Sequence, residues 1–65
     1  MTTYRCPQMF FDMMRGASTE TEKQIVRSCV VEWMALLMLV PGDKVLSPNP
    51  VNGEVEEFVY NPTVN

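Results

Sequence analysis

Histidine is absent from this sequence, and other residues that support enzyme chemistry are few. Without histidine, the chain lacks the side chain that most often serves as a general base and the most frequent metal ligand in proteins. The three glycines, Gly16, Gly42 and Gly53, stand apart and form no glycine-rich phosphate loop. These absences argue against an enzyme, and we predict no catalytic residue, no cofactor and no metal site.

Basic residues are also scarce, and they are scattered along the chain. Five lysines and arginines stand against eight aspartates and glutamates, which gives a net charge of −3. Nucleic-acid binding draws much of its affinity from clustered cations that neutralise phosphates, so this balance argues against a nucleic-acid partner. One alternative of that class stays open: a small helix-turn-helix-like DNA-binding regulator that gathers its cations by acting as an oligomer.

Cysteine occurs only twice, at Cys6 and Cys29. The two thiols are too far apart in sequence for a CxxC pair, and without histidine they cannot complete a usual zinc site. A disulfide between them is one interpretation. The first residues lack the basic and then apolar pattern of a secretory signal, so we favour free thiols and a cytoplasmic location.

Apolar residues, in contrast, are plentiful enough for one small folded domain. Of the 65 residues, 46% are hydrophobic and 20% are charged, which is typical of a globular chain and too apolar for a disordered one. We predict a single α+β domain in the order helix, helix, strand, strand (ααββ). Its segments are a short helix at 7–15, a main helix at 19–40, a β-hairpin at 43–60 and a tail at 61–65.

The short helix is predicted from the residues at its ends and from its apolar spacing. Pro7 suits the first helical position, and Gly16 suits the left-handed position that follows a helix. Its expected buried face comprises Met9, Phe10, Met13 and Met14.

The main helix has a stronger start signal. Thr19 and Glu22 fit a capping box, with Ser18 as an alternative cap, and Pro41 cannot continue the helix. On a helical wheel, one arc holds the stripe expected to face the core: Ile25, Val26, Cys29, Val30, Trp33, Leu36, Leu37 and Val40.

The second half of the main helix is also apolar on its opposite side, at Val31, Met34, Ala35, Met38 and Leu39. A helix that is apolar all round is buried all round. Two interpretations stay open. Either the short helix and the hairpin cover opposite faces of the main helix, or this second face contacts another molecule.

The hairpin is predicted to have a long connection, because Pro48 and Pro50 cannot donate to a strand ladder. The pair Glu56-Glu57 breaks the alternation of its second strand, which indicates a bulge or an edge position. We interpret Glu54, Glu56 and Glu57 as a solvated edge that discourages aggregation rather than as paired catalytic acids.

Taken together, these patterns predict a small non-enzymatic interaction protein that binds a protein partner, itself, or both. Such a chain is consistent with an accessory or inhibitory factor of the kind that phages and mobile elements make. A membrane-active peptide is a third alternative, although the apolar stretch of the helix reaches only about 24 Å, short of a bilayer core of roughly 30 Å. The expected interface residues are Val31, Met34, Met38 and Leu39, with Phe58 and Tyr60 as a second patch.

Overall fold

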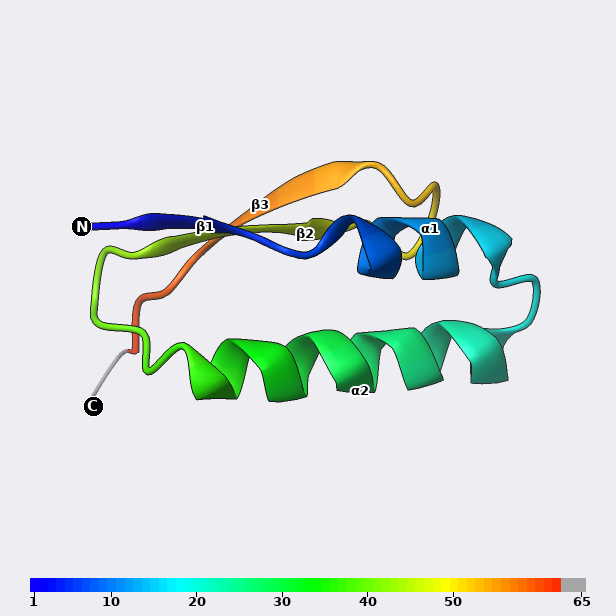
Figure 1. Ribbon diagram of the computed structural model, residues 1–65, viewed down its shortest axis with the longest axis horizontal. Coiled ribbons are helices and arrows are strands. Elements are labelled where there is room, and N and C mark those ends of the chain that lie inside the picture. Colours follow the sequence, from blue (N-terminus) through cyan, green and yellow to red (C-terminus); the bar gives the residue numbers. More distant parts are fainter. Residues whose placement is uncertain (63–65) are drawn as a thin grey trace.

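The computed structural model describes residues 1–62 and shows two helices and a three-stranded sheet (Figure 1). The elements in chain order are β1 (Thr3–Arg5), α1 (Gln8–Gly16), α2 (Glu20–Leu36), β2 (Lys44–Pro48) and β3 (Val55–Val59). The predicted α+β class is confirmed, with two helices followed by a hairpin. The structure adds β1, which is too short to show an alternating pattern in the sequence. Of the predicted tail at 61–65, residues 63–65 lie outside the described residues.

The sheet has the strand order β1-β2-β3. β1 lies parallel to β2, with Tyr4 opposite Val45, and β3 lies antiparallel to β2, with Phe58 opposite Val45. The β2–β3 register is continuous along both strands, so the pair Glu56-Glu57 marks an edge strand and not a bulge. The connection between these strands is six residues long, 49–54, so the predicted long loop is confirmed. The expectation that Pro48 lies in this loop is wrong, because Pro48 is the last residue of β2, opposite Val55.

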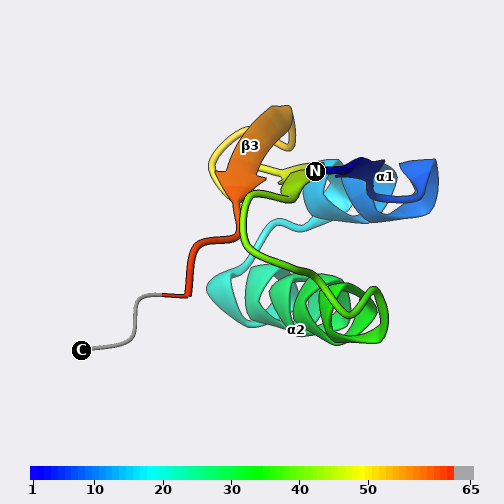
Figure 2. The same cartoon turned by 90° about the vertical axis from the view of Figure 1, so that its left-hand side faces the viewer.

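The elements form two layers. In the end-on view of Figure 2, α1 and β3 lie on opposite sides of β2, and α2 lies beneath them. The core gathers where α1, α2 and the end of β1 meet. Its buried members are Cys6, Phe11, Met14, Val26 and Val30, with Phe10, Trp33 and Met34 packed against them.

The buried face of α1 differs from the prediction. Phe11 is fully buried and Met14 nearly so, whereas Met9 and Met13 are exposed and Phe10 is half-buried. The physical reason is that α1 lies beside β2 and above α2 at once, so its inner side points into the angle between them. The periodicity was compatible with several such faces, and only the packing selects one.

The ends of α1 are each displaced by one residue from the prediction. Pro7 precedes the helix instead of opening it, and Gly16 is the last helical residue instead of a left-handed one. The chain leaves the helix at Ala17, which is extended and donates its N–H to the Met14 carbonyl. The helix therefore ends without a left-handed residue.

The start of α2 confirms the predicted capping box. The Thr19 hydroxyl accepts from the Glu22 N–H at 3.1 Å, and the Glu22 carboxylate accepts from the Thr19 N–H at 3.2 Å. Ser18 also donates its hydroxyl to this carboxylate, at 3.0 Å. These hydrogen bonds lower the pKa of Glu22, with the one from the Ser18 side chain contributing most.

The end of α2 comes four residues before the predicted end at residue 40. Leu37 donates its N–H to the Met34 carbonyl, and Met38 then adopts a left-handed conformation with φ 53°. Beyond this point the Val40 N–H donates to the Asp43 carboxylate at 3.1 Å. Residues 37–40 thus lie outside the helix, and the turn that follows holds the Val40 N–H.

The buried stripe of α2 is narrower than predicted. Val26 and Val30 are buried, and Cys29, Trp33 and Leu37 are half-buried. Ile25 and Leu36, at one margin of the arc, are exposed. Val40 is also exposed, and it lies beyond the end of α2. The reason is that one helix of nine residues, α1, covers only a narrow line along α2.

Candidate interaction groove

All six residues predicted as interface anchors line one groove. Its volume is about 370 Å³. One wall is the C-terminal half of α2 with the turn after it, and the other wall is the end of β3. The lining residues are Val31, Met34, Ala35, Met38, Leu39, Phe58 and Tyr60. The sequence suggested two separate patches, and the fold brings them together as a single surface, which we call the apolar groove.

The apolar groove is open to solvent although its lining is hydrophobic. Met38 is 85% exposed, Val31 55% and Phe58 43%. Met34, Leu39 and Tyr60 are half-buried. Met34 also packs against the core cluster, so the groove begins where the core ends.

The position of the groove follows from strand alternation. Phe58 and Glu56 share the face of β3 that points toward α2, because side chains alternate along a strand. Their partners on β2, Val45 and Ser47, share that face. α2 packs mainly against α1, although it extends beneath the sheet in Figure 2. Every residue of β3 is exposed, so the inner face of this strand and the side of α2 below it leave the groove open to solvent.

A second hollow extends the groove along α2. It has a volume of about 450 Å³ and shares Val31, Met34 and Phe58 with the apolar groove, so the two are continuous. Its far end is more polar, with Arg27 on α2 and Glu56 on β3. The combined trough runs along the whole inner side of β3.

Three acidic residues lie on or next to β3, the edge strand of the hairpin. Glu54, Glu56 and Glu57 are all exposed, as a solvated edge requires. Glu57 forms an ion pair with Lys44 across the outer face of the sheet at 3.7 Å. Both side chains of this pair are about half exposed, so it contributes at most about 1 kcal/mol.

The two cysteines are both free, which confirms the prediction. Cys6 is buried in the core, and Cys29 is half-buried. Burial raises the pKa of the Cys6 thiol to about 11, while the nearby Arg5 charge acts in the opposite direction. This thiol is therefore protonated at neutral pH and is a poor nucleophile.

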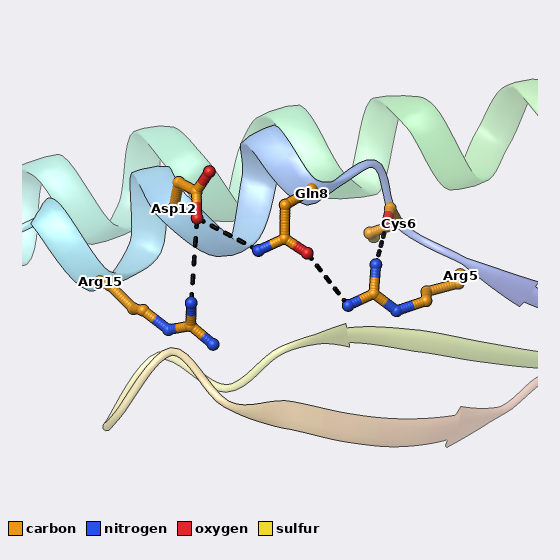
Figure 3. Close-up of polar contacts among 5 residues, drawn as sticks. All are labelled: Arg5, Cys6, Gln8, Asp12 and Arg15. Atoms are coloured by element: carbon orange, nitrogen blue, oxygen red, sulfur yellow. Dashed lines mark hydrogen bonds and ion pairs between the residues drawn. The ribbon is translucent and has the colours of Figure 1, made fainter.

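A ladder of polar contacts runs along the outer side of α1 (Figure 3). Arg5 donates to the Gln8 side chain at 3.2 Å, and Gln8 donates to Asp12 at 3.2 Å. Arg15 forms an ion pair with the same Asp12 oxygen at 3.8 Å. The Arg5 guanidinium also lies 4.5 Å from the centroid of the Phe11 ring. Sequence reasoning missed Arg5 because β1 was not predicted, although the Gln8–Asp12–Arg15 spacing is a readable helical signal.

Within residues 1–62, no helix is both long enough and apolar enough to cross a membrane. The same part of the chain brings no three Cys, Asp or Glu side chains together in a way that could hold a metal ion. No protein-family model, curated protein or solved structure matches the chain. The groove thus has to be interpreted from its own geometry and chemistry.

Proposed function

We propose that this protein is a small non-enzymatic interaction module that binds a protein partner through the apolar groove. One observation carries the proposal. Residues from two distant parts of the chain, the end of α2 and the end of β3, converge on one solvent-open hydrophobic surface. Exposed apolar side chains also occur elsewhere on this chain, but Val31, Met38 and Phe58 lie together in the groove. A contiguous apolar surface of this kind is typical of a contact surface, whereas single exposed apolar residues are common on any protein.

The residue types in the groove also suit binding. Met34 and Met38 have flexible, polarisable side chains that adapt to different partner shapes. Phe58 and Tyr60 provide aromatic anchors, which bury a large area each and are enriched in energetically important interface positions. An accessory or inhibitory role fits such a module. We propose that it acts in the cytoplasm, a reducing compartment with which two free thiols are consistent.

The test compares Met38→Glu with Leu36→Glu. Both residues are more than 80% exposed near the end of α2, but only Met38 lines the groove. Immobilised wild-type and variant proteins are exposed to a lysate of the source cells, and captured proteins are compared by mass spectrometry. We expect the wild type and Leu36→Glu to retain the same partner, and Met38→Glu to lose it.

Circular dichroism and Trp33 fluorescence confirm that both variants fold. Equal retention by Met38→Glu and Leu36→Glu would contradict the proposal, as would equal loss. Light scattering across a range of concentrations determines whether the groove also mediates self-association, in which case Met38→Glu alone should reduce the solution mass.

A further inference from the structure

Among residues 1–62, β3 pairs only with β2, so no described strand covers the backbone groups on its outer edge. Tyr60 donates its N–H to Asp43, and the Glu54 carbonyl accepts from Asn49, so both residues point their backbone groups toward β2. Backbone direction alternates along a strand. The N–H and C=O groups of Val55, Glu57 and Val59 therefore point away from the sheet.

This free edge lies beside the trough. Side-chain and backbone directions alternate together, so the residues that turn their backbone outward also turn their side chains to the outer face. A strand added at this edge would place alternate side chains over the trough and the others beside Glu57. The added segment would pair its backbone with β3 and bury its apolar side chains in the trough. Peptides that bind by strand addition combine these two contacts.

The charge distribution indicates what such a segment would carry. The four bases and four acids before residue 43 cancel. The segment 43–60 holds Lys44 against Asp43, Glu54, Glu56 and Glu57, so it carries the whole net charge of −3. Asp43 is buried, and the exposed part of this charge comes from the three glutamates and Lys44. Two copies joined edge to edge would bring these charges together, whereas a basic partner would neutralise them.

We propose that β3 binds an extended segment of a partner protein by strand addition, with apolar side chains facing the trough and basic side chains facing outward beside Glu57. This inference rests on the proposed function and specifies the partner's chemistry. β1 is the other edge of the sheet, but it is only three residues long and lines neither hollow.

The probe is a capped nine-residue peptide that alternates valine and lysine, titrated into isotope-labelled protein and followed by NMR. We expect saturable binding, with slower amide exchange at Val55, Glu57 and Val59. The Phe58 amide points toward β2 and should change little. A control peptide with glutamate in place of lysine should bind at least roughly tenfold more weakly, because like charges then meet.

Methylating the peptide amides tests the pairing without altering the protein. In antiparallel addition, the amides that face β3 belong to the lysines, and in parallel addition they belong to the valines. Methylation of one set should weaken binding at least roughly tenfold and methylation of the other should be tolerated. Equal effects of the two sets would overturn strand addition.

On the protein side, Val59→Pro removes an outward N–H from an edge strand, where proline is tolerated, and Val59→Ala is the matched control. We expect only the proline variant to lose peptide affinity. If Met38→Glu weakens peptide binding and Val59→Pro does not, strand addition is wrong. The proposal that the apolar groove binds a partner would then still be supported. The inference is also overturned if the peptide fails to bind at millimolar concentration. It is equally overturned if the free protein is a dimer with the Val55, Glu57 and Val59 amides already protected, because a second copy would then occupy the edge.

Discussion

Asp43 connects three parts of the chain through a single buried residue. Its carboxylate accepts from the Thr2 N–H at 2.8 Å and from the Val40 N–H at 3.1 Å. Its carbonyl accepts from the Tyr60 N–H at 2.8 Å. The N-terminal segment, the turn after α2 and the end of β3 are therefore joined at one side chain.

These contacts make stability depend on acid pH. The hydrogen bonds from the Val40 and Thr2 amides lower the pKa of Asp43 below its ordinary value near 3.8. Near and below that pH the unfolded chain binds more protons than the folded one, so stability is lost as pH falls through the folded pKa. We expect Asp43→Asn to reduce stability at pH 7 and to flatten this acid dependence, measured by urea unfolding between pH 2 and 7. An unchanged acid dependence in the variant would contradict this assignment.

Alanine substitution at two glycines, Gly53 and Gly16, should change the stability of the fold in opposite directions. Gly53 has φ +73°, and a Cβ there would overlap the Arg15 side chain and lie 3.2 Å from the Arg15 nitrogen. Gly16 is helical, and a Cβ added there would meet no atom of another element within 4 Å. We expect Gly53→Ala to destabilise the fold by roughly 1–3 kcal/mol and Gly16→Ala to stabilise it by roughly 0.5–1 kcal/mol. Chemical denaturation followed by Trp33 fluorescence measures both, and a shift of the same sign in the two variants would refute the contrast.

At the scale of elements, the two ends of α2 differ in how far local sequence determines them. Thr19 and Glu22 form their reciprocal bonds within one turn, so the pattern alone predicts the start. The end depends on Asp43, which lies outside the helix and captures the Val40 N–H. Nothing in residues 37–40 signals that contact, so the helix was predicted to end only at residue 40, before Pro41.

The left-handed Met38 gives a direct test of this helix end. Glycine adopts that conformation without steric cost, and Met38 loses little packing because its side chain is 85% exposed. We expect Met38→Gly to raise the free energy of unfolding by up to about 1 kcal/mol. The control, Leu36→Gly, places glycine in the last helical turn and should lower it by about as much. Thermal unfolding by circular dichroism distinguishes the two, and destabilisation by both would show that Met38 is not strained.

At the scale of the whole molecule, α1 is the element that joins the two layers. Its Phe11 is fully buried in the core cluster, next to the buried Val26 and Val30 of α2. Phe58, in contrast, is 43% exposed over the groove. One phenylalanine, in α1, is therefore part of the core, and the other, in β3, is accessible to a partner.

Truncating these two residues should separate stability from binding. We expect Phe11→Ala to cost roughly 3–5 kcal/mol, enough to unfold much of a domain this small. Phe58→Ala should leave the protein folded, with a loss below about 1.5 kcal/mol, because the side chain is only partly buried. Equilibrium unfolding of both variants is the measurement, and equal losses would mean that the groove is part of the core.

Much of the groove could be predicted from periodicity, but its assembly could not. The second apolar side of the main helix identified Val31 and Met34, and Phe58 and Tyr60 were predicted as a second patch. Their meeting depends on α2 packing against α1 more than against β3, which no local pattern encodes. The exposed Met9 and Met13 show the same limit, because hydrophobicity alone did not distinguish the covered side of α1.

The parallel pairing of β1 with β2 also has a consequence for the timing of folding. Thr2 and Asp43, joined by a hydrogen bond, are 41 positions apart in sequence. The helices can form and pack through contacts between neighbours, whereas this pairing must close a long loop first. We expect the sheet to complete late and to set the folding rate. During synthesis, β1 cannot pair until β2 has emerged from the ribosome. Its three residues therefore remain unpaired while most of the chain is made.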